Sequence, residues 1–106
     1  MTKGATKITA VVQSTRFKRD IKRLQKQGKD LADLQSIIKT LVKEKLLDPK
    51  FKDHKLVGNW KGHRDCHIEP DWLLVYKVEA NVFHLVRTGS HAELFDLRRV
   101  RFHVDV

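Results

Sequence analysis

Apolar residues in the first third of the chain recur with a helical period. Phe17, Ile21 and Leu24 are spaced by four and three residues, which predicts a helix with one narrow apolar stripe over residues 15–27. Ser14 stands where the N-cap of this helix is expected, since its hydroxyl can accept a hydrogen bond from a free backbone N–H. The outer surface of the helix is basic.

A second helix is predicted from about residue 31 to residue 45, after Gly28 ends the first and Asp30 caps the next. Pro49 ends the pattern, because the residue before a proline is pushed out of helical geometry. Its broad apolar face comprises Leu31, Leu34, Ile37, Ile38, Leu41 and Val42. Two consecutive helices with a short joint predict an antiparallel hairpin.

The remaining apolar segments are β-branched or alternate with a period of two, which predicts strands. The expected strands are residues 8–13, 63–68, 72–78 and 82–88, with residues 54–57 as a short strand or an extended loop. Ser90 and Glu93 form a capping box for a short helical turn that ends at Phe95. The order β-α-α-β-β-β predicts an α+β fold, with the helix hairpin on one face of a mostly antiparallel four-stranded sheet.

Length and composition favour a single cytoplasmic domain. The 106 residues suffice for one core, which we expect over about residues 8–95, with residues 1–7 and 96–106 as terminal extensions. The second extension could be a fifth strand, a binding element or a tail. A single cysteine excludes an internal disulfide, and no run approaches the roughly 18 apolar residues of a membrane span.

The net charge of +9 and the pI near 9.9 point to a polyanionic partner such as nucleic acid or an acidic protein. A DNA-binding role is not favoured, because neither predicted helix carries base-reading residues in the pattern of a recognition helix. A basic domain that binds RNA or an acidic partner without catalysis is one interpretation.

Residues 51–72 concentrate groups that transfer protons near neutral pH. This stretch holds three of the six histidines, four carboxylates and both tryptophans: His54, His63, His67, Asp53, Asp65, Glu69, Asp71, Trp60 and Trp72. A second cluster, RTGSHAELF, spans residues 87–95. We expect the two to meet in space and to form one site.

Two other chemistries are open for the first stretch. Alternation along a strand would place His63, Asp65 and His67 on one face, which is either a site for a divalent metal or a half-exposed polar face. No zinc signature such as HExxH is present. Cys66 would face the other way with Ile68, so an inert buried thiol is favoured over a nucleophile.

Cleavage of RNA through its own 2′-hydroxyl is the reaction that these residue types fit without a metal. It needs a base, an acid and a cation that stabilises the charge on the phosphate in the transition state. Histidine suits the first two roles and arginine the third. The residues able to supply them are His54, His67, Asp71, His91 and Arg87. Trp72 or Phe95 would stack on an unpaired base.

The segments DHKLVGNWKGHRDCHIEPDW (53–72) and RTGSHAELF (87–95) resemble the YafQ branch of the RelE-type toxins of bacterial toxin–antitoxin systems. The resemblance covers about residues 8–95. It implies a RelE-like fold and a metal-independent endoribonuclease, without a cofactor, that cuts messenger RNA in the ribosomal A site and so arrests translation. It also implies an acidic antitoxin that binds a toxin monomer in a hetero-oligomeric complex.

The resemblance also assigns roles to residues of this chain. The catalytic groups would be His54, His67, Asp71 and His91, with His91 as the leading general acid. Asp65, Trp72, Arg87 and Phe95 would bind or support the substrate. Members of the family end near the position of Phe95, whereas eleven residues follow it here, three of them arginines. These residues either cover the site or extend the basic surface.

Overall fold

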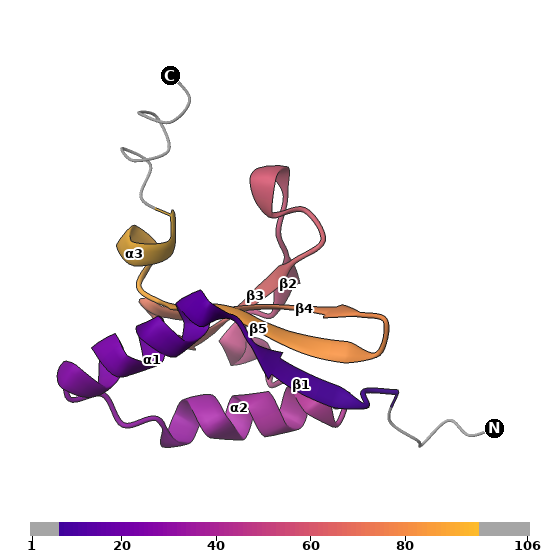
Figure 1. Ribbon diagram of the computed structural model, residues 1–106, viewed down its shortest axis with the longest axis horizontal. Coiled ribbons are helices and arrows are strands. Elements are labelled where there is room, and N and C mark those ends of the chain that lie inside the picture. The colour runs from indigo at the N-terminus through magenta and orange to yellow at the C-terminus, as the bar shows by residue number, and fades with distance from the viewer. Residues whose placement is uncertain (1–6, 96–106) are drawn as a thin grey trace.

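A mixed five-stranded sheet is the frame of residues 7–95, the part of the chain that the computed structural model describes (Figure 1). Along the chain the elements are β1 (Ala10–Gln13), α1 (Thr15–Lys26), α2 (Ala32–Val42), the 3-10 turn η1 (Pro49–Phe51), β2 (His54–Lys55), the 3-10 turn η2 (Gly58–Trp60), β3 (Arg64–Glu69), β4 (Trp72–Glu79), β5 (Val82–Gly89) and α3 (His91–Phe95). The α+β class and the order of helices and strands are therefore as predicted. The interpretations of residues 1–6 and 96–106 lie outside the described residues.

The sheet has the strand order β1-β5-β4-β3-β2, one strand more than predicted. The fifth is β2, in which His54 pairs with Asp65 and Lys55 with Arg64. Two residues are too few to show an alternating pattern, so only the antiparallel pairing with β3 identifies the strand. β1 runs parallel to β5, and the helix hairpin carries the chain from β1 at one edge of the sheet to β2 at the other.

Local signals set the ends of most helices. The hydroxyl of Ser14 accepts a hydrogen bond from the N–H of Phe17 at 2.9 Å, which confirms the predicted N-cap of α1. α2 ends at Val42, three residues before the predicted end, because the chain turns through a left-handed conformation at Glu44 (φ 58°). The apolar pattern continued past this point, but Leu46 is 97% exposed.

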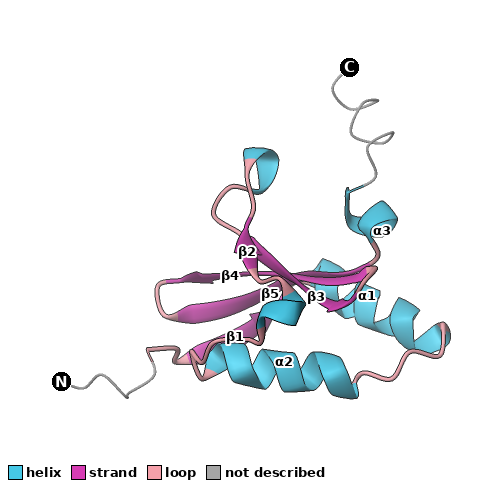
Figure 2. Cartoon of the chain, turned by 180° about the vertical axis from the view of Figure 1, so that it is seen from behind, coloured by secondary structure: helices cyan, strands magenta, loops and turns pink. Residues whose placement is uncertain are grey.

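The sheet buries a different cluster on each face. Helices α1 and α2 cover one face, as Figure 2 shows, and pack on the side chains of Cys66, Leu74, Tyr76, Phe83 and Leu85. On the opposite face, Leu73 and Val75 pack against Leu94 of α3 and against the segment around η2. Within residues 7–95, the second face is covered by short segments rather than by long helices. No helix within residues 7–95 is long and apolar enough to cross a membrane.

Candidate active site

Alternation along β3 sends the side chains of Asp65 and His67 to the sheet face opposite α1 and α2. Cys66 and Ile68 belong to the core under the helices, while Asp65 and His67 pair with Val75 and Leu73 on the other face. Cys66 has no exposed surface, and burial raises the pKa of its thiol to about 12. A thiol that stays protonated and has no access to solvent is not a nucleophile.

The two histidine-bearing segments meet on this face. The ring of His67 on β3 and the ring of His91 on α3 make an edge-to-face contact with centroids 5.5 Å apart. The His54 ring on β2 lies 6.4 Å from that of His67. We call His54, His67 and His91 the histidine cluster. Tertiary structure thus brings together three residues that are up to 37 positions apart in sequence.

Asp71 orients His91. One carboxylate oxygen of Asp71, Oδ1, accepts a hydrogen bond from the backbone N–H of His91 at 2.9 Å and lies 2.6 Å from the ring Nδ1 of the same residue. These two hydrogen bonds lower the pKa of Asp71, so the carboxylate is ionised at neutral pH. An ionised carboxylate at Nδ1 holds the proton there and leaves Nε2 of His91 available to a substrate.

His54 is held at both ring nitrogens. Its Nδ1 lies 2.7 Å from the carbonyl oxygen of Lys52, and its Nε2 lies 3.1 Å from Oδ1 of Asp65. Asp65 is 4% exposed, and burial raises the pKa of its carboxyl, partly offset by the charges of the three histidines. Within residues 7–95 no hydrogen bond satisfies that Oδ1 atom, so the contact with His54 is its nearest polar interaction.

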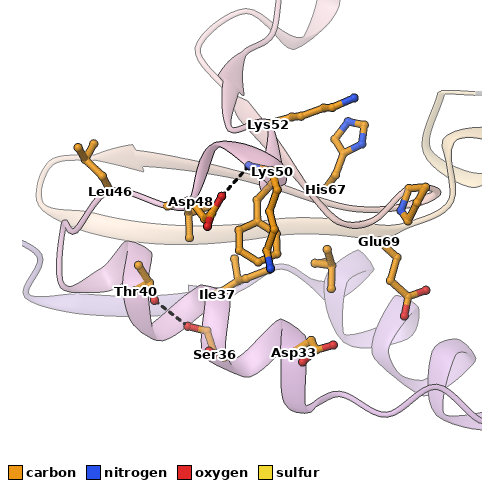
Figure 3. A pocket seen from close by; sticks show the side chains of 14 residues that line it. Asp33, Ser36, Ile37, Thr40, Leu46, Asp48, Lys50, Lys52, His67 and Glu69 are labelled. Carbon is orange, nitrogen blue, oxygen red and sulfur yellow. Dashed lines mark hydrogen bonds between the residues drawn. The ribbon is translucent and has the colours of Figure 1, made fainter.

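His67 differs from the other two histidines because no hydrogen bond within residues 7–95 occupies its ring. Burial lowers the pKa of His67, Asp65 opposes the shift, and the nearby charges of His91, Lys52 and His54 add to it. Figure 3 shows His67 and Lys52 at one end of a pocket of about 740 Å³ between α2, η1 and β3. A neutral imidazole with a free nitrogen is able to accept a proton.

Arg87 is engaged by a buried carboxylate rather than exposed to solvent. Its Nε and Nη2 donate to Asp20 of α1 at 2.7 and 3.0 Å, and its side chain is 15% exposed. Burial alone would raise the pKa of Asp20, but hydrogen bonds from Arg87, from the Thr88 N–H and from Arg23 outweigh it and lower that pKa. Of the guanidinium nitrogens, Nη1 makes no hydrogen bond within residues 7–95.

The structure separates the two aromatic residues that were expected to contact a base. Trp72 is 2% exposed and its indole N–H donates to Oγ1 of Thr88 at 2.9 Å. A ring buried in this way cannot stack on a nucleobase, so its expected role as a stacking surface is wrong, and Trp72 instead supports β4 and β5 from within the core. Phe95 is partly exposed on α3, and its ring makes an edge-to-face contact with Trp60, at 5.6 Å between centroids.

Asp65 is also displaced from its expected role of binding substrate. It lies 3.1 Å from Nε2 of His54 with its side chain 5% exposed, so it has little surface with which to contact a substrate directly. His63 lies outside β3, with its Nδ1 3.2 Å from the Trp60 carbonyl, and does not join Asp65 and His67. Among the described residues, no group of three or more histidine, cysteine or acidic side chains is placed to hold a metal ion.

Lys52 lies beside the histidine cluster although it was not among the candidate site residues. Lys52 contacts His54 through its carbonyl and acts on His67 through its charge. Its left-handed backbone (φ 51°) is what turns the carbonyl toward His54. The position of Lys52 two residues before His54, in a tight turn after Pro49, is the only sequence signal for it.

A helix hairpin on one face of a small sheet, with a cluster of histidines and aspartates on the other, is the arrangement of a small enzyme for acid–base chemistry. The chain belongs to the YafQ family, described as the bacterial toxin of type II toxin–antitoxin systems, whose model matches residues 9–96. The resemblance inferred from the two sequence segments is thereby confirmed.

Individual relatives agree with this assignment. The chain is 43% identical over 83 residues to the mRNA interferase toxin YafQ of Escherichia coli K12, covering 77% of this chain and 90% of that protein. The fold is similar to that in the crystal structure of the E. coli DinJ–YafQ complex (TM-score 0.75, 41% identity, 80% of this chain and 96% of that one). It is also similar to a metal-bound toxin from Helicobacter pylori (TM-score 0.77, 46% identity, 83% and 99%).

Proposed function

We propose that this chain is an endoribonuclease that cuts messenger RNA on the ribosome by metal-independent acid–base catalysis through the 2′-hydroxyl. The observation that carries the proposal is the pair of facing imidazoles, His67 and His91, whose ring centroids are 5.5 Å apart. Transfer of the phosphate to the 2′ oxygen needs a base at one side of the phosphorus and an acid at the other. The name of the E. coli relative, mRNA interferase, supports the substrate class.

His67 is the general base in this proposal. Its lowered pKa keeps the imidazole neutral at physiological pH, and its ring nitrogens are free of hydrogen bonds within residues 7–95. A neutral imidazole takes the proton from the 2′-hydroxyl as that oxygen attacks the phosphorus. The nearby ammonium of Lys52 disfavours a second proton on the ring before the substrate arrives.

His91 is the general acid. Asp71 accepts from its Nδ1 and stabilises the positive charge of the imidazolium, which then donates from Nε2 to the departing 5′ oxygen. After cleavage His67 carries a proton and His91 has lost one, so water must reset both rings before the next turnover. The rings of His67 and His91 are in contact, and the charge of His91 is one of the causes that lower the pKa of His67.

The remaining groups bind the substrate. His54, with its Nδ1 at the Lys52 carbonyl and its Nε2 3.1 Å from Asp65, assists as an orienting group beside the phosphate. The free Nη1 of Arg87 donates to a phosphate oxygen, in an orientation that Asp20 fixes. Phe95 offers a partly exposed ring on which a base stacks.

The exposed basic surface of α1 supports binding to a large polyanion such as the ribosome. Asp20, the only acid of this helix, is buried, whereas the basic side chains along its outer surface are exposed: Arg16, Lys18, Arg19, Lys22 and Lys26. Such a surface favours contact with the ribosomal RNA phosphates. The toxin would act in the cytoplasm, where an acidic antitoxin neutralises the free monomer in a hetero-oligomeric complex, as DinJ forms a complex with YafQ in E. coli.

The test is a reconstituted translation reaction with a defined messenger RNA, mapped by primer extension. We expect cuts at the codon in the A site, a 5′ fragment ending in a 2′,3′-cyclic phosphate, and no cut where the attacking nucleotide is 2′-deoxy. The same RNA without ribosomes should stay intact. His91→Ala should slow cleavage by about 10²–10⁴-fold. Intact transcripts in the presence of ribosomes would instead identify a silent RNA- or antitoxin-binding protein.

A further inference from the structure

Three side chains on the helix-covered face of the sheet tie β2 to its neighbours. The hydroxyl of Tyr76 on β4 donates to Oδ1 of Asp53 at 2.5 Å. Nε of Arg64 on β3 lies 3.2 Å from the same oxygen and 3.3 Å from the Tyr76 hydroxyl. We call Asp53, Arg64 and Tyr76 the β2 clamp. Tyr76 and Arg64 are direct register partners, so the sheet itself sets the geometry of two of its three members.

β2 needs such a restraint because it is a short edge strand. Its own pairing with β3 is limited to two residue pairs, and beyond them Leu56 N–H donates to the His63 carbonyl at 2.9 Å. A two-residue strand with one open edge resists rotation about its axis only weakly. The clamp adds a third point of attachment immediately before His54.

Rotation of β2 is the motion that would misplace His54. Successive side chains on a strand point to opposite faces, so Asp53 faces Tyr76 while His54 faces Asp65 on the other face. A fixed Asp53 therefore sets the direction of the His54 side chain through the intervening backbone. The ring of His54 then lies 3.1 Å from Asp65 and 6.4 Å from the His67 ring.

The clamp is anchored by one buried residue, Tyr76, to which the partly exposed side chains of Asp53 and Arg64 are bound. Tyr76 is 3% exposed and its ring stacks on Phe83, with centroids 5.1 Å apart and planes 9° from parallel. Burial and the Asp53 carboxylate raise the pKa of Tyr76, so its hydroxyl keeps the proton that it donates. Burial lowers the pKa of Arg64, but hydrogen bonds with Tyr76 and Asp53 outweigh it, so the guanidinium stays charged. The polar contacts of the clamp therefore persist across the physiological range.

We propose that Asp53, Arg64 and Tyr76 are positioning residues that hold the edge strand β2 in the orientation that places His54 against Asp65 within the histidine cluster. None of the three touches the substrate, and each acts through His54. This inference rests on the proposed function only for the role of His54 in cleavage. The placement of His54 by the clamp is a separate claim that can be measured without any reaction.

The kinetic test is a double-mutant cycle between Tyr76→Phe and His54→Ala. Tyr76→Phe removes one hydroxyl and keeps the ring against Phe83. We expect it to lower the single-turnover cleavage rate on programmed ribosomes by about tenfold, with little change in substrate affinity. In the His54→Ala background the same substitution should have an effect of less than about twofold, because its target is gone. Equal effects in both backgrounds would overturn the proposal.

Ser14→Ala is the matched control. It also removes one hydroxyl that bridges two elements, since Ser14 caps α1 and donates to the Val86 carbonyl at 2.7 Å. Ser14→Ala should lower the stability of the fold, and its effect should be the same whether or not the His54 side chain is present. If Tyr76→Phe does not fold, Asp53→Asn replaces it in the same cycle, with the same expected dependence on His54 and the same overturning result.

The second readout is the histidine-ring ¹⁵N spectrum of the purified full-length chain. In the wild type the His54 Nδ1–H, protected by the Lys52 carbonyl, should give a resolved signal. Tyr76→Phe should broaden or remove it and leave the His91 signal unchanged, while Ser14→Ala should affect neither. An unchanged His54 signal overturns the inference even if the chain cleaves no RNA. If Tyr76→Phe changes the His54 signal but the wild-type chain cleaves no RNA, the proposed function alone is overturned.

Discussion

Asp20 on α1 binds Arg87 on β5 through two hydrogen bonds, from Nε at 2.7 Å and from Nη2 at 3.0 Å. The same carboxylate accepts from the Thr88 N–H at 3.0 Å and from Arg23 at 2.8 Å. Arg23 in turn pairs with Glu93 on α3, the helix that carries His91. One buried carboxylate thereby links the first helix, the last strand and the site.

Replacing Asp20 should destabilise the fold severely. Asp20→Ala leaves the Arg87 guanidinium, 15% exposed, without its partner, at a cost of about 3–5 kcal/mol. Because the folded pKa of Asp20 lies below its ordinary value of 3.8, this contribution is present above that pH and is lost as the pH falls through the folded pKa. Urea unfolding at neutral and acidic pH measures it. Glu69→Gln, which breaks the exposed Lys29 pair, is the control and should change little.

The contribution of Asp65 to stability should depend on pH in the opposite direction to that of Asp20. Its folded pKa lies above the ordinary value of 3.8, so the ionised carboxylate opposes folding, and stability falls as the pH rises from 3.8 through the folded pKa. Asp65→Asn is therefore expected to raise the midpoint of thermal unfolding at neutral pH and to slow cleavage, since His54 loses its charged partner. Calorimetry and a cleavage assay on one preparation test both. A lower midpoint would contradict this account of Asp65.

The acidic limb of the pH–rate profile should report His67. A base with a pKa lowered by burial is neutral, and active, at pH values below its ordinary 6.5. Lys52→Met removes one of the positive charges that lower this pKa, so the limb should move to higher pH. Lys50→Met is the matched control, because Lys50 lies over the Phe51 ring. A limb that stays in place in Lys52→Met would exclude His67 as the titrating base.

Trp72 and Phe95 should separate stability from substrate binding. Trp72→Phe removes the hydrogen bond to Thr88 and should cost about 1–3 kcal/mol of unfolding free energy, with affinity for programmed ribosomes unchanged. Phe95→Leu should weaken that affinity about tenfold through lost stacking and leave stability nearly unchanged. Denaturant titration and binding measurements on both variants test the pair. Weakened binding in Trp72→Phe at full stability would restore its role as a contact residue.

Metal independence can be tested without removing the magnesium that ribosomes require. A phosphorothioate at the scissile position should slow cleavage, and manganese or cadmium should not restore the rate, because in the proposed mechanism side chains rather than a metal contact the phosphate oxygens. Rescue by a thiophilic metal would show that a metal takes part in the reaction. This test has weight because a similar toxin from H. pylori has been crystallised in a metal-bound form.

The sequence determined much of this fold because its signals are local. Spacing along the chain predicted both helices, the strands β1, β3, β4 and β5 and the two serine caps, which depend on residues within a turn of one another. Where the deciding contact was distant, the sequence left residues 54–57 open as a short strand or an extended loop and placed the end of α2 three residues too late. β2 exists through its pairing with β3, and α2 ends early although the apolar pattern continues.

The sequence also indicated acid–base chemistry for the site, because the segments 51–72 and 87–95 concentrate histidines and acidic residues. Tertiary structure alone decided which of those groups work together. Whether a side chain faces the helices or the open face depends on strand register, which buries Trp72 and Asp65. The exposure of Phe95 depends instead on how α3 packs on the sheet. The partners of Arg87 and His54 come from elements that the chain brings together only on folding. The sequence gives the type of each residue. Its burial and its neighbours are set by the folded sheet, and these determine its pKa and the groups that it can contact.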